Sequence, residues 1–126
     1  MKIAISIYGN RISPRFDFSP EMWIIEVEMG KIVGQEKLST ANLNLPQRLE
    51  QISLNAVDKV ICGGIDGFCQ NQLGGRGIDI VQDVMGDAEI VFDLFMKGRL
   101  QPGLYCEGKR RRRFCGRRNA SGGRRI

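Results

Sequence analysis

The sequence predicts an α/β fold, with a mixed sheet and flanking helices over residues 1–103 and a basic tail over residues 104–126. The first supporting observation is a pair of short segments near the N-terminus in which apolar and polar residues alternate. The second is a change from a period of about 2 to about 3.6 residues near Asn44. The third is charge: residues 104–126 hold nine of the 19 Lys and Arg residues and one of the 14 Asp and Glu residues, a net +8, which leaves −3 for the rest.

The N-terminal half contains three predicted strands. Residues 2–8 are rich in isoleucine with small residues between, which is typical of a strand covered on both faces. Residues 22–28 alternate in polarity, and residues 31–38 follow after Met29-Gly30, so we expect an antiparallel hairpin. Met before Gly favours a type II turn over a type I′ turn.

From Asn44 onward, predicted helices alternate with short strands. Asn44 is a suitable N-cap, and Pro46 suits the first helical turn. The predicted elements are a helix from residue 44 to about 56, a strand at 59–62, a helix at 66–73, a strand at 78–81 and a helix at 87–97. The order β-ββ-α-β-α-β-α places a hairpin before βαβ crossovers. Beyond Pro102-Gly103 the Arg and Gly content predicts a tail that is disordered unless something binds it.

Length and composition bound the functional classes. The 126 residues, 42% of them apolar, suit a single domain. No run approaches the roughly 20 apolar residues of a membrane span, and the N-terminus is too short for a signal peptide, so we expect a cytoplasmic protein without membrane contact. In that compartment the four cysteines are thiols or metal ligands rather than disulfides. The absence of histidine removes His-based acid–base catalysis and His-ligated zinc.

The sharpest functional signal is the loop Cys62-Gly63-Gly64-Ile65-Asp66. Its glycines would let the backbone approach a ligand closely, and amides at the start of the next helix favour an anion. The same helix terminus favours the thiolate of Cys62. The alternative is a tight turn with Cys62 as a buried apolar residue. The spacing matches neither nucleotide-binding fingerprint, which argues against ATP and NAD.

A second glycine-marked loop, residues 9–16, follows the first predicted strand. Arg11 and Arg15 flank Ser13-Pro14, and the proline fixes a backbone that could present both guanidinium groups to an anion. The alternative is that the arginines are solvated or pair with Asp17. Because ligands of open α/β sheets bind at the carboxyl ends of strands, we expect the two loops to lie side by side.

The cysteines form no C-x-x-C pair, so zinc-ribbon and thioredoxin interpretations are weak. Four thiolates, from Cys62, Cys69, Cys106 and Cys115, could converge on an iron-sulfur or other soft-metal site if the tail folded back over the second loop. The alternative for Cys69 is inward packing on its helix. Caps explain Asp66 and Asp87, no acid–base pair is evident, and we expect a binding protein rather than an enzyme.

The tail has the composition of a nucleic-acid-binding arm. Residues 109–113 are all basic, and Phe114 could stack on a base. The alternatives are a solvated tail, or one that grips an acidic partner or an anionic cluster.

Three segments together resemble the dinitrogenase iron-molybdenum cofactor biosynthesis family. They are Gly9-Asn10-Arg11-Ile12-Ser13-Pro14-Arg15-Phe16-Asp17, Val60-Ile61-Cys62-Gly63-Gly64-Ile65 and Phe95-Met96-Lys97-Gly98-Arg99-Leu100. The resemblance spans nearly all of residues 1–103 and leaves the tail outside. It implies a ribonuclease H-like fold with a mixed five-stranded sheet. It does not imply nuclease activity, because the required carboxylate cluster is not evident.

The resemblance also implies a role in binding, assembling or delivering a molybdenum- and/or iron-containing sulfide cluster or its precursor, as nitrogenase accessory proteins do. Small stand-alone members occur in bacteria and archaea, including anaerobes, and one similar to this chain holds a molybdenum-copper sulfide cluster non-covalently. Histidines thought to be used by some nitrogenase-associated relatives are missing here, which disfavours tight ligation of the iron-molybdenum cofactor itself.

The expected pocket lies between the two loops, with the cluster held non-covalently or by weak ligation. Its expected residues are Asn10, Arg11, Ser13, Arg15, Phe16, Cys62, Gly63, Gly64 and Ile65. Cys62 is the expected metal ligand, and Cys69, Cys106 and Cys115 are further candidates. The expected partners are the cluster and an acceptor apoprotein, with nucleic acid bound through the tail only, and the chain is expected to be a monomer or a weak homodimer.

Overall fold

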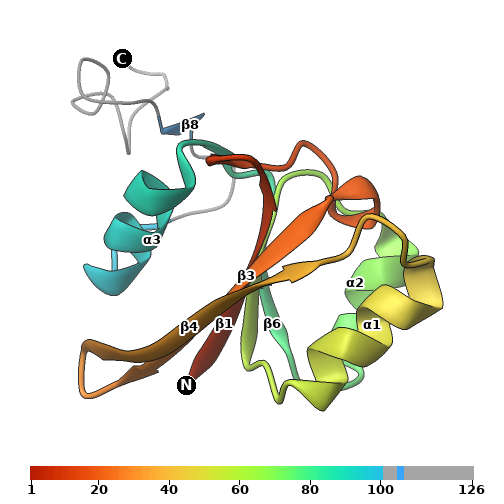
Figure 1. The fold of residues 1–126 in the computed structure, drawn as a ribbon, viewed down its shortest axis with the longest axis horizontal. Coiled ribbons are helices and arrows are strands. Elements are labelled where there is room, and N and C mark those ends of the chain that lie inside the picture. The colour runs from red at the N-terminus through yellow and green to blue at the C-terminus, as the bar shows by residue number, and fades with distance from the viewer. Residues whose placement is uncertain (101–104, 107–126) are drawn as a thin grey trace.

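The computed structural model describes residues 1–100 and 105–106, and it confirms the predicted α/β fold. Five strands lie side by side in the order β4-β3-β1-β5-β6, and the short β2 pairs back onto β1 (Figure 1). The strands are β1 (Lys2–Tyr8), β2 (Arg11–Ile12), β3 (Glu21–Glu28), β4 (Lys31–Ser39), β5 (Lys59–Ile61) and β6 (Asp79–Val81). The sheet is mixed, because β1 pairs antiparallel with β3 and parallel with β5.

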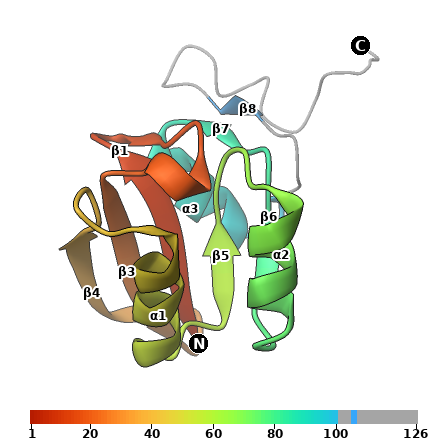
Figure 2. The ribbon, with the colours of Figure 1, turned by 90° about the vertical axis from the view of Figure 1, so that its right-hand side faces the viewer.

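The helices cover both faces of the sheet. In Figure 2, α1 (Leu45–Leu54) and α2 (Gly67–Gly74) lie in front of the sheet, and α3 (Ala88–Met96) lies behind it. All three predicted caps are present, since the side chains of Asn44, Asp66 and Asp87 accept backbone amides in the first turns of their helices. No helix among residues 1–100 is long and apolar enough to cross a membrane.

Strand β1 forms the centre of two apolar cores. Ile3, Ile5 and Ile7 are buried against residues of α3. On the opposite face, Ala4 belongs to the core that includes residues of α1 and α2. This burial on both sides confirms the prediction made from residues 2–8, because strand side chains alternate between the two faces.

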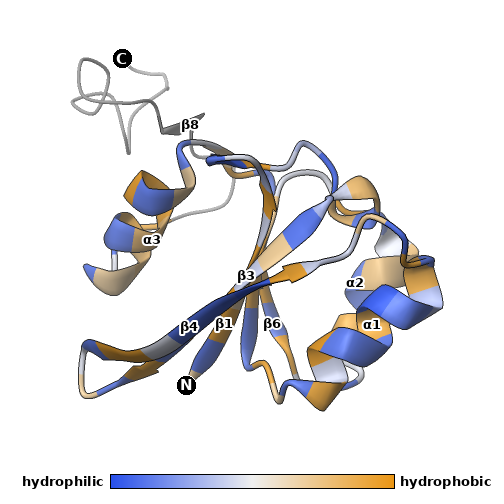
Figure 3. Ribbon diagram, viewed as in Figure 1, coloured by the Kyte–Doolittle hydropathy of each residue, from blue (hydrophilic) through white to orange (hydrophobic). Residues whose placement is uncertain are grey.

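The hairpin between β3 and β4 is closed by a two-residue turn, with Glu28 paired to Lys31. Met29 and Gly30 have φ of 53° and 76°. Positive φ at both positions is the type I′ pattern, so the expected preference for type II was wrong. The type I′ turn prevails because its twist matches that of the flanking strands. The central part of β4 is hydrophilic (Figure 3), which suits an edge strand exposed along most of its length.

A second, two-stranded sheet lies at the end of the molecule where β1 finishes (Figure 2). It consists of β7 (Met85–Gly86) and β8 (Tyr105–Cys106), which are parallel, with Gly86 paired to Cys106. The sequence placed residues 105–106 in a tail that is disordered unless something binds it, whereas the structure describes these two residues as β8. The other tail residues lie outside the described part of the chain.

Replacing Ser6 with alanine is expected to stabilise the protein. The Ser6 hydroxyl is fully buried and finds no hydrogen-bond partner within the described residues. Because a buried unpaired hydroxyl is costly, Ser6→Ala should raise the free energy of unfolding by about 0.5–1 kcal/mol in urea denaturation. Ser13→Ala is the matched control, since the buried Ser13 hydroxyl donates to the Arg15 carbonyl oxygen at 3.1 Å and its removal should destabilise. Losses of the same size in both variants would contradict this account.

Candidate functional site

The two loops expected to enclose a cluster pack directly on each other. The Phe16 amide donates to the Gly64 carbonyl oxygen at 2.8 Å, and the Gly64 amide donates to the Pro14 carbonyl oxygen at 2.7 Å. Arg15 and Gly64 therefore form a parallel bridge between the loops. The prediction that the loops lie side by side is confirmed, but they leave no room for a cluster at this contact.

Gly63 and Gly64 serve this contact between loops. A Cβ atom on Gly63 would lie 2.4 Å from the Ser13 carbonyl oxygen and 2.7 Å from the Pro14 carbonyl oxygen. The close approach predicted from the two glycines is real, but the approaching group is the chain's own backbone. The expectation that the Gly64 amide serves an anion is also wrong, because that amide is used by Pro14.

Cys62 is fully buried at the end of β5 rather than exposed beside a helix terminus. Burial, with smaller contributions from Asp83 and Cys69, raises the pKa of the Cys62 thiol to about 12. The expected stabilisation of the thiolate is therefore wrong, and Asp66 already caps the start of α2. Cys69 is buried as well. Burial is the main cause that raises its pKa to about 12, and Asp66 contributes in the same direction. The prediction that Cys69 packs inward is confirmed.

Three other expected site residues have structural contacts. Phe16 is fully buried, and the partly buried Ile65 packs against the same core on the α1 and α2 side. The Ser13 amide donates to the Ser6 carbonyl oxygen at 2.9 Å, which ties the loop to β1. These contacts hold residues 13–16 in place and turn the Phe16 side chain inward.

The arginines of the first loop have different surroundings. Arg15 donates from Nε and Nη2 to the two carboxylate oxygens of Asp17, at 3.1 and 3.0 Å. This ion pair confirms the alternative that Arg15 pairs with Asp17. The Arg15 guanidinium also lies 5.1 Å from the centre of the Phe18 ring. Arg11 is exposed, and its backbone forms a bridge with Asp87 at the start of α3.

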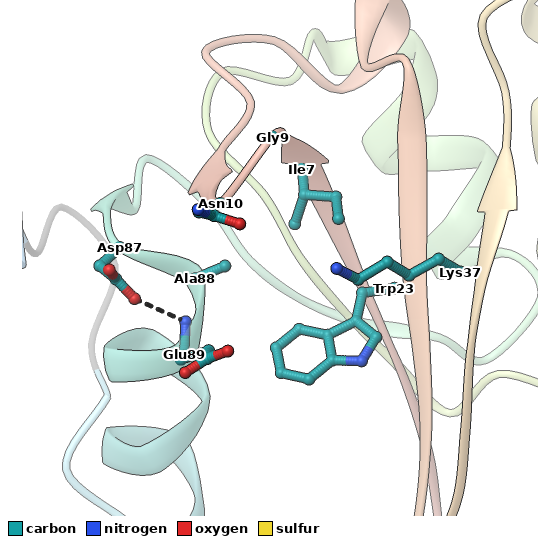
Figure 4. A pocket seen from close by; sticks show the side chains of 8 residues that line it. All are labelled: Ile7, Gly9, Asn10, Trp23, Lys37, Asp87, Ala88 and Glu89. Carbon is teal, nitrogen blue, oxygen red and sulfur yellow. Dashed lines mark hydrogen bonds between the residues drawn. The ribbon is translucent and has the colours of Figure 1, made fainter.

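A cavity of about 160 Å³ opens next to the first loop, on the α3 side of the sheet (Figure 4). It is lined by Ile7, Gly9, Asn10, Trp23, Lys37, Asp87, Ala88 and Glu89. Only Gly9 and Asn10 belong to the loop identified from the sequence. The others come from β1, β3, β4 and α3, and pairing of Trp23 with Lys37 brings two of them together. No local motif marks these positions, so sequence reasoning missed them.

The electrostatics of this cavity disfavour an anion. The first amides of α3 are already used, because Ala88 donates to the Asn10 carbonyl oxygen at 2.9 Å and Glu89 and Ile90 donate to the Asp87 carboxylate. Two carboxylates, Asp87 and Glu89, face one ammonium, Lys37. The lining thus carries a net negative charge at neutral pH.

Convergence of four thiols on one metal is not seen in the described part of the chain. Among those residues, no group of three or more His, Cys, Asp or Glu side chains could hold a metal ion. Cys62 and Cys69 belong to the core beneath α1 and α2. The backbone of Cys106 instead lies beside Gly86 in β7, and Cys115 lies outside the described residues.

The two core thiols are expected to resist alkylation in the native state. In a Cys106→Ser/Cys115→Ser variant, only Cys62 and Cys69 remain, and a pKa of about 12 leaves roughly one thiol in ten thousand ionised near pH 8. Iodoacetamide should modify neither until the protein is unfolded, as measured by mass spectrometry. Rapid modification of the native variant would contradict the burial of these thiols.

The same thiols predict a loss of stability in alkali. Their ordinary pKa is 9.0, so the unfolded chain releases their protons near that value while the folded chain keeps them to about 12. Their contribution to stability is therefore present below pH 9 and falls between about pH 9 and 12. A Cys62→Ala/Cys69→Ala variant should show a weaker decline over that range in urea denaturation. An equal decline would show that other groups cause it.

Comparison with known proteins places this geometry in context. The sequence model of a family described as dinitrogenase iron-molybdenum cofactor matches residues 1–98. An uncharacterized protein of Methanocaldococcus jannaschii is 24% identical over 109 residues, which cover 80% of this chain and 90% of that protein. The crystal structure of PH0822 superposes with a TM-score of 0.75 at 20% identity, over 81% of this chain and 94% of that one. A candidate dinitrogenase from M. jannaschii superposes with a TM-score of 0.68 at 20% identity, over 80% and 92%.

Proposed function

Because this chain belongs to the dinitrogenase iron-molybdenum cofactor family, we propose that it binds a molybdenum- and/or iron-containing sulfide cluster and assembles or delivers it. We expect this role to be binding rather than catalysis; of its carboxylates, Asp66 and Asp87 serve as helix caps. Delivery requires an acceptor apoprotein. The cytoplasm, where thiols stay reduced, suits such a cargo.

The pairing of Gly86 with Cys106 is the observation that supports a location for the cluster. It brings Cys106 to the end of the sheet where Asn10 and Arg11 lie, because Arg11 bridges Asp87, the residue after Gly86. The backbone segments that carry Cys106, whose thiolate would be a soft ligand, and Arg11 are therefore neighbours. The buried Cys62, in contrast, would have to leave the core to reach a cluster.

The charge of the chain also favours this location. A metal-sulfide cluster is anionic, and the described loop contributes two guanidinium groups, that of Arg15, which pairs with Asp17, and that of the exposed Arg11, whose backbone bridges Asp87 next to β7. The nine basic residues of the tail begin after Cys106 and supply the remaining positive charge. Copper could join molybdenum in such a sulfide-rich cluster, because thiolate and sulfide ligands suit Cu(I).

Substitution of Cys106 and Arg11 tests this location. The apoprotein would be reconstituted anaerobically with tetrathiomolybdate, cuprous ion or ferrous iron with sulfide, and metal and sulfide per chain measured. Arg11→Gln should weaken uptake about tenfold, and Cys106→Ser should lower occupancy further. Lys97→Gln removes one charge from a surface pair with Asp93 and should leave uptake unchanged, as should Cys62→Ala. Equal losses in Arg11→Gln and Lys97→Gln would show a general charge effect instead of a site.

A second candidate function is nucleic-acid or partner binding through the tail, favoured by its net charge of +8. Phosphate neutralisation releases counterions, so affinity for nucleic acid should fall steeply with salt. Changing Arg110, Arg111, Arg112 and Arg113 to Gln should flatten that dependence. Salt-dependent binding that survives in this variant would place the contact elsewhere.

A further inference from the structure

The cavity beside Asn10 has the chemistry of a receptor for a guanidinium group. Figure 4 shows Trp23 and Lys37 on one side, and the start of α3 with Asp87 and Glu89 on the other. An aromatic face and carboxylates both attract a planar cation. The volume of about 160 Å³ fits one such group, since an engineered cavity of roughly 150 Å³ binds one benzene molecule.

The chain carries a source of such groups next to this cavity. Strand β8 ends at Cys106, which pairs with Gly86, and Gly86 directly precedes the cavity residue Asp87. At no more than about 3.6 Å per residue, Lys109 can lie no more than about 11 Å beyond Cys106 along the chain, and Arg113 no more than about 25 Å. The basic run of residues 109–113 therefore starts within reach of the cavity.

Charge and tethering favour docking within one molecule. The tail carries +8, whereas residues 1–103 carry −3, and two carboxylates line the cavity. A short tether gives the run an effective concentration in the millimolar range, so a weak contact suffices for occupancy.

We propose that one arginine of residues 110–113 docks into this cavity in the same chain, with its guanidinium beside the Asp87 and Glu89 carboxylates and the Trp23 ring. Docking fills the cavity and holds the rest of the basic run at the end of the sheet where β1 finishes. It requires no cluster, so it goes beyond the proposed function and stands or falls separately.

Trp23 provides the test, because it is the only tryptophan in the chain. Its indole N–H, which donates to Gln35, gives a single cross-peak in a 15N-correlated NMR spectrum. In full-length metal-free protein this peak should shift as salt rises from about 0.05 to about 1 M, because salt screens the contact. With Arg110, Arg111, Arg112 and Arg113 changed to Gln, the peak should already lie at its high-salt position. Identical low-salt positions in wild type and this variant would overturn the proposal.

Single substitutions of the charged cavity residues should weaken or strengthen docking according to the charge that they remove. Glu89→Gln should reduce the salt-dependent shift by half or more, and Asp87→Asn should do the same while keeping a good helix cap. Lys37→Gln removes the like charge and should raise the salt concentration needed for release. Asp93→Asn, on the exposed pair with Lys97, is the control and should behave as wild type. A shift that is unchanged by Glu89→Gln and Asp87→Asn would place the docked arginine elsewhere.

Dilution separates docking within one chain from docking between two. A contact within one chain gives the same low-salt peak position at every protein concentration. A position that changes on tenfold dilution would assign the arginine to a second copy and overturn docking in the same chain.

Discussion

Gly63→Ala is expected to destabilise the protein by about 3 kcal/mol or more, a large part of the stability of a domain this size. The added methyl would lie 2.4 Å and 2.7 Å from two backbone oxygens, which cannot rotate away as a side chain can. The loop of residues 13–16 must move, and its hydrogen bonds with Gly64 would be lost. Urea denaturation followed by far-UV circular dichroism measures this change.

Gly67→Ala is the matched control for this prediction. Gly67 begins α2, and a Cβ atom there meets nothing within 4 Å. Because alanine favours a helix over glycine, the variant should be neutral or up to about 1 kcal/mol more stable. If Gly63→Ala were as stable as Gly67→Ala, the close packing of the two loops would be contradicted.

Arg48→Met is expected to cost about 2–3 kcal/mol of unfolding free energy. The buried guanidinium donates from Nη1 to the Ser19 carbonyl oxygen at 2.6 Å and from Nε to the Leu43 carbonyl oxygen at 3.2 Å. It thereby joins α1 to the segments on either side of the β3–β4 hairpin. Burial lowers the pKa of Arg48, and Asp17 acts against that shift, so the side chain stays charged at neutral pH.

Arg76→Met is the control, because it shows what the loss of an exposed arginine costs in unfolding free energy. The exposed Arg76 also donates to a carbonyl oxygen, that of Leu49 at 2.9 Å, and to the Ser53 hydroxyl at 2.7 Å. Water can replace these hydrogen bonds, so the cost should stay below about 1 kcal/mol. Thermal or urea unfolding of both variants would compare them, and equal costs would contradict the importance of burial at Arg48.

The fold could be predicted from local signals because capping residues and glycines mark where its helices begin and end. Asn44 and Asp87 cap their helices as expected, and Gly98, with φ of 70°, follows α3. The alternation of residues 2–8 also predicted burial on both faces of β1. Each of these features depends on residues within one or two turns or strand repeats of each other, so the sequence alone reveals them.

The site depended on contacts between distant segments, which the sequence does not encode locally. Gly63 and Gly64 gave a correct signal for close approach, but their partner proved to be the carbonyl oxygens of Ser13 and Pro14, about 50 residues earlier. Cys62 proved to be buried in the core beneath α1 and α2, which reversed the expected direction of its pKa. The cavity required the register of the predicted hairpin, which pairs Trp23 with Lys37, and the position of α3 beside it, and no local motif specified either.

The amounts of metal and acid-labile sulfide per chain test most directly the central claim, that the protein binds a metal-sulfide cluster. Full-length protein would be purified without oxygen from a metal-replete anaerobic host, and iron, molybdenum, copper and sulfide determined together. Binding of a cluster predicts molybdenum or iron in near-stoichiometric amount, with sulfide in proportion. Protein that is free of metal and cannot be reconstituted would contradict a cluster-binding role.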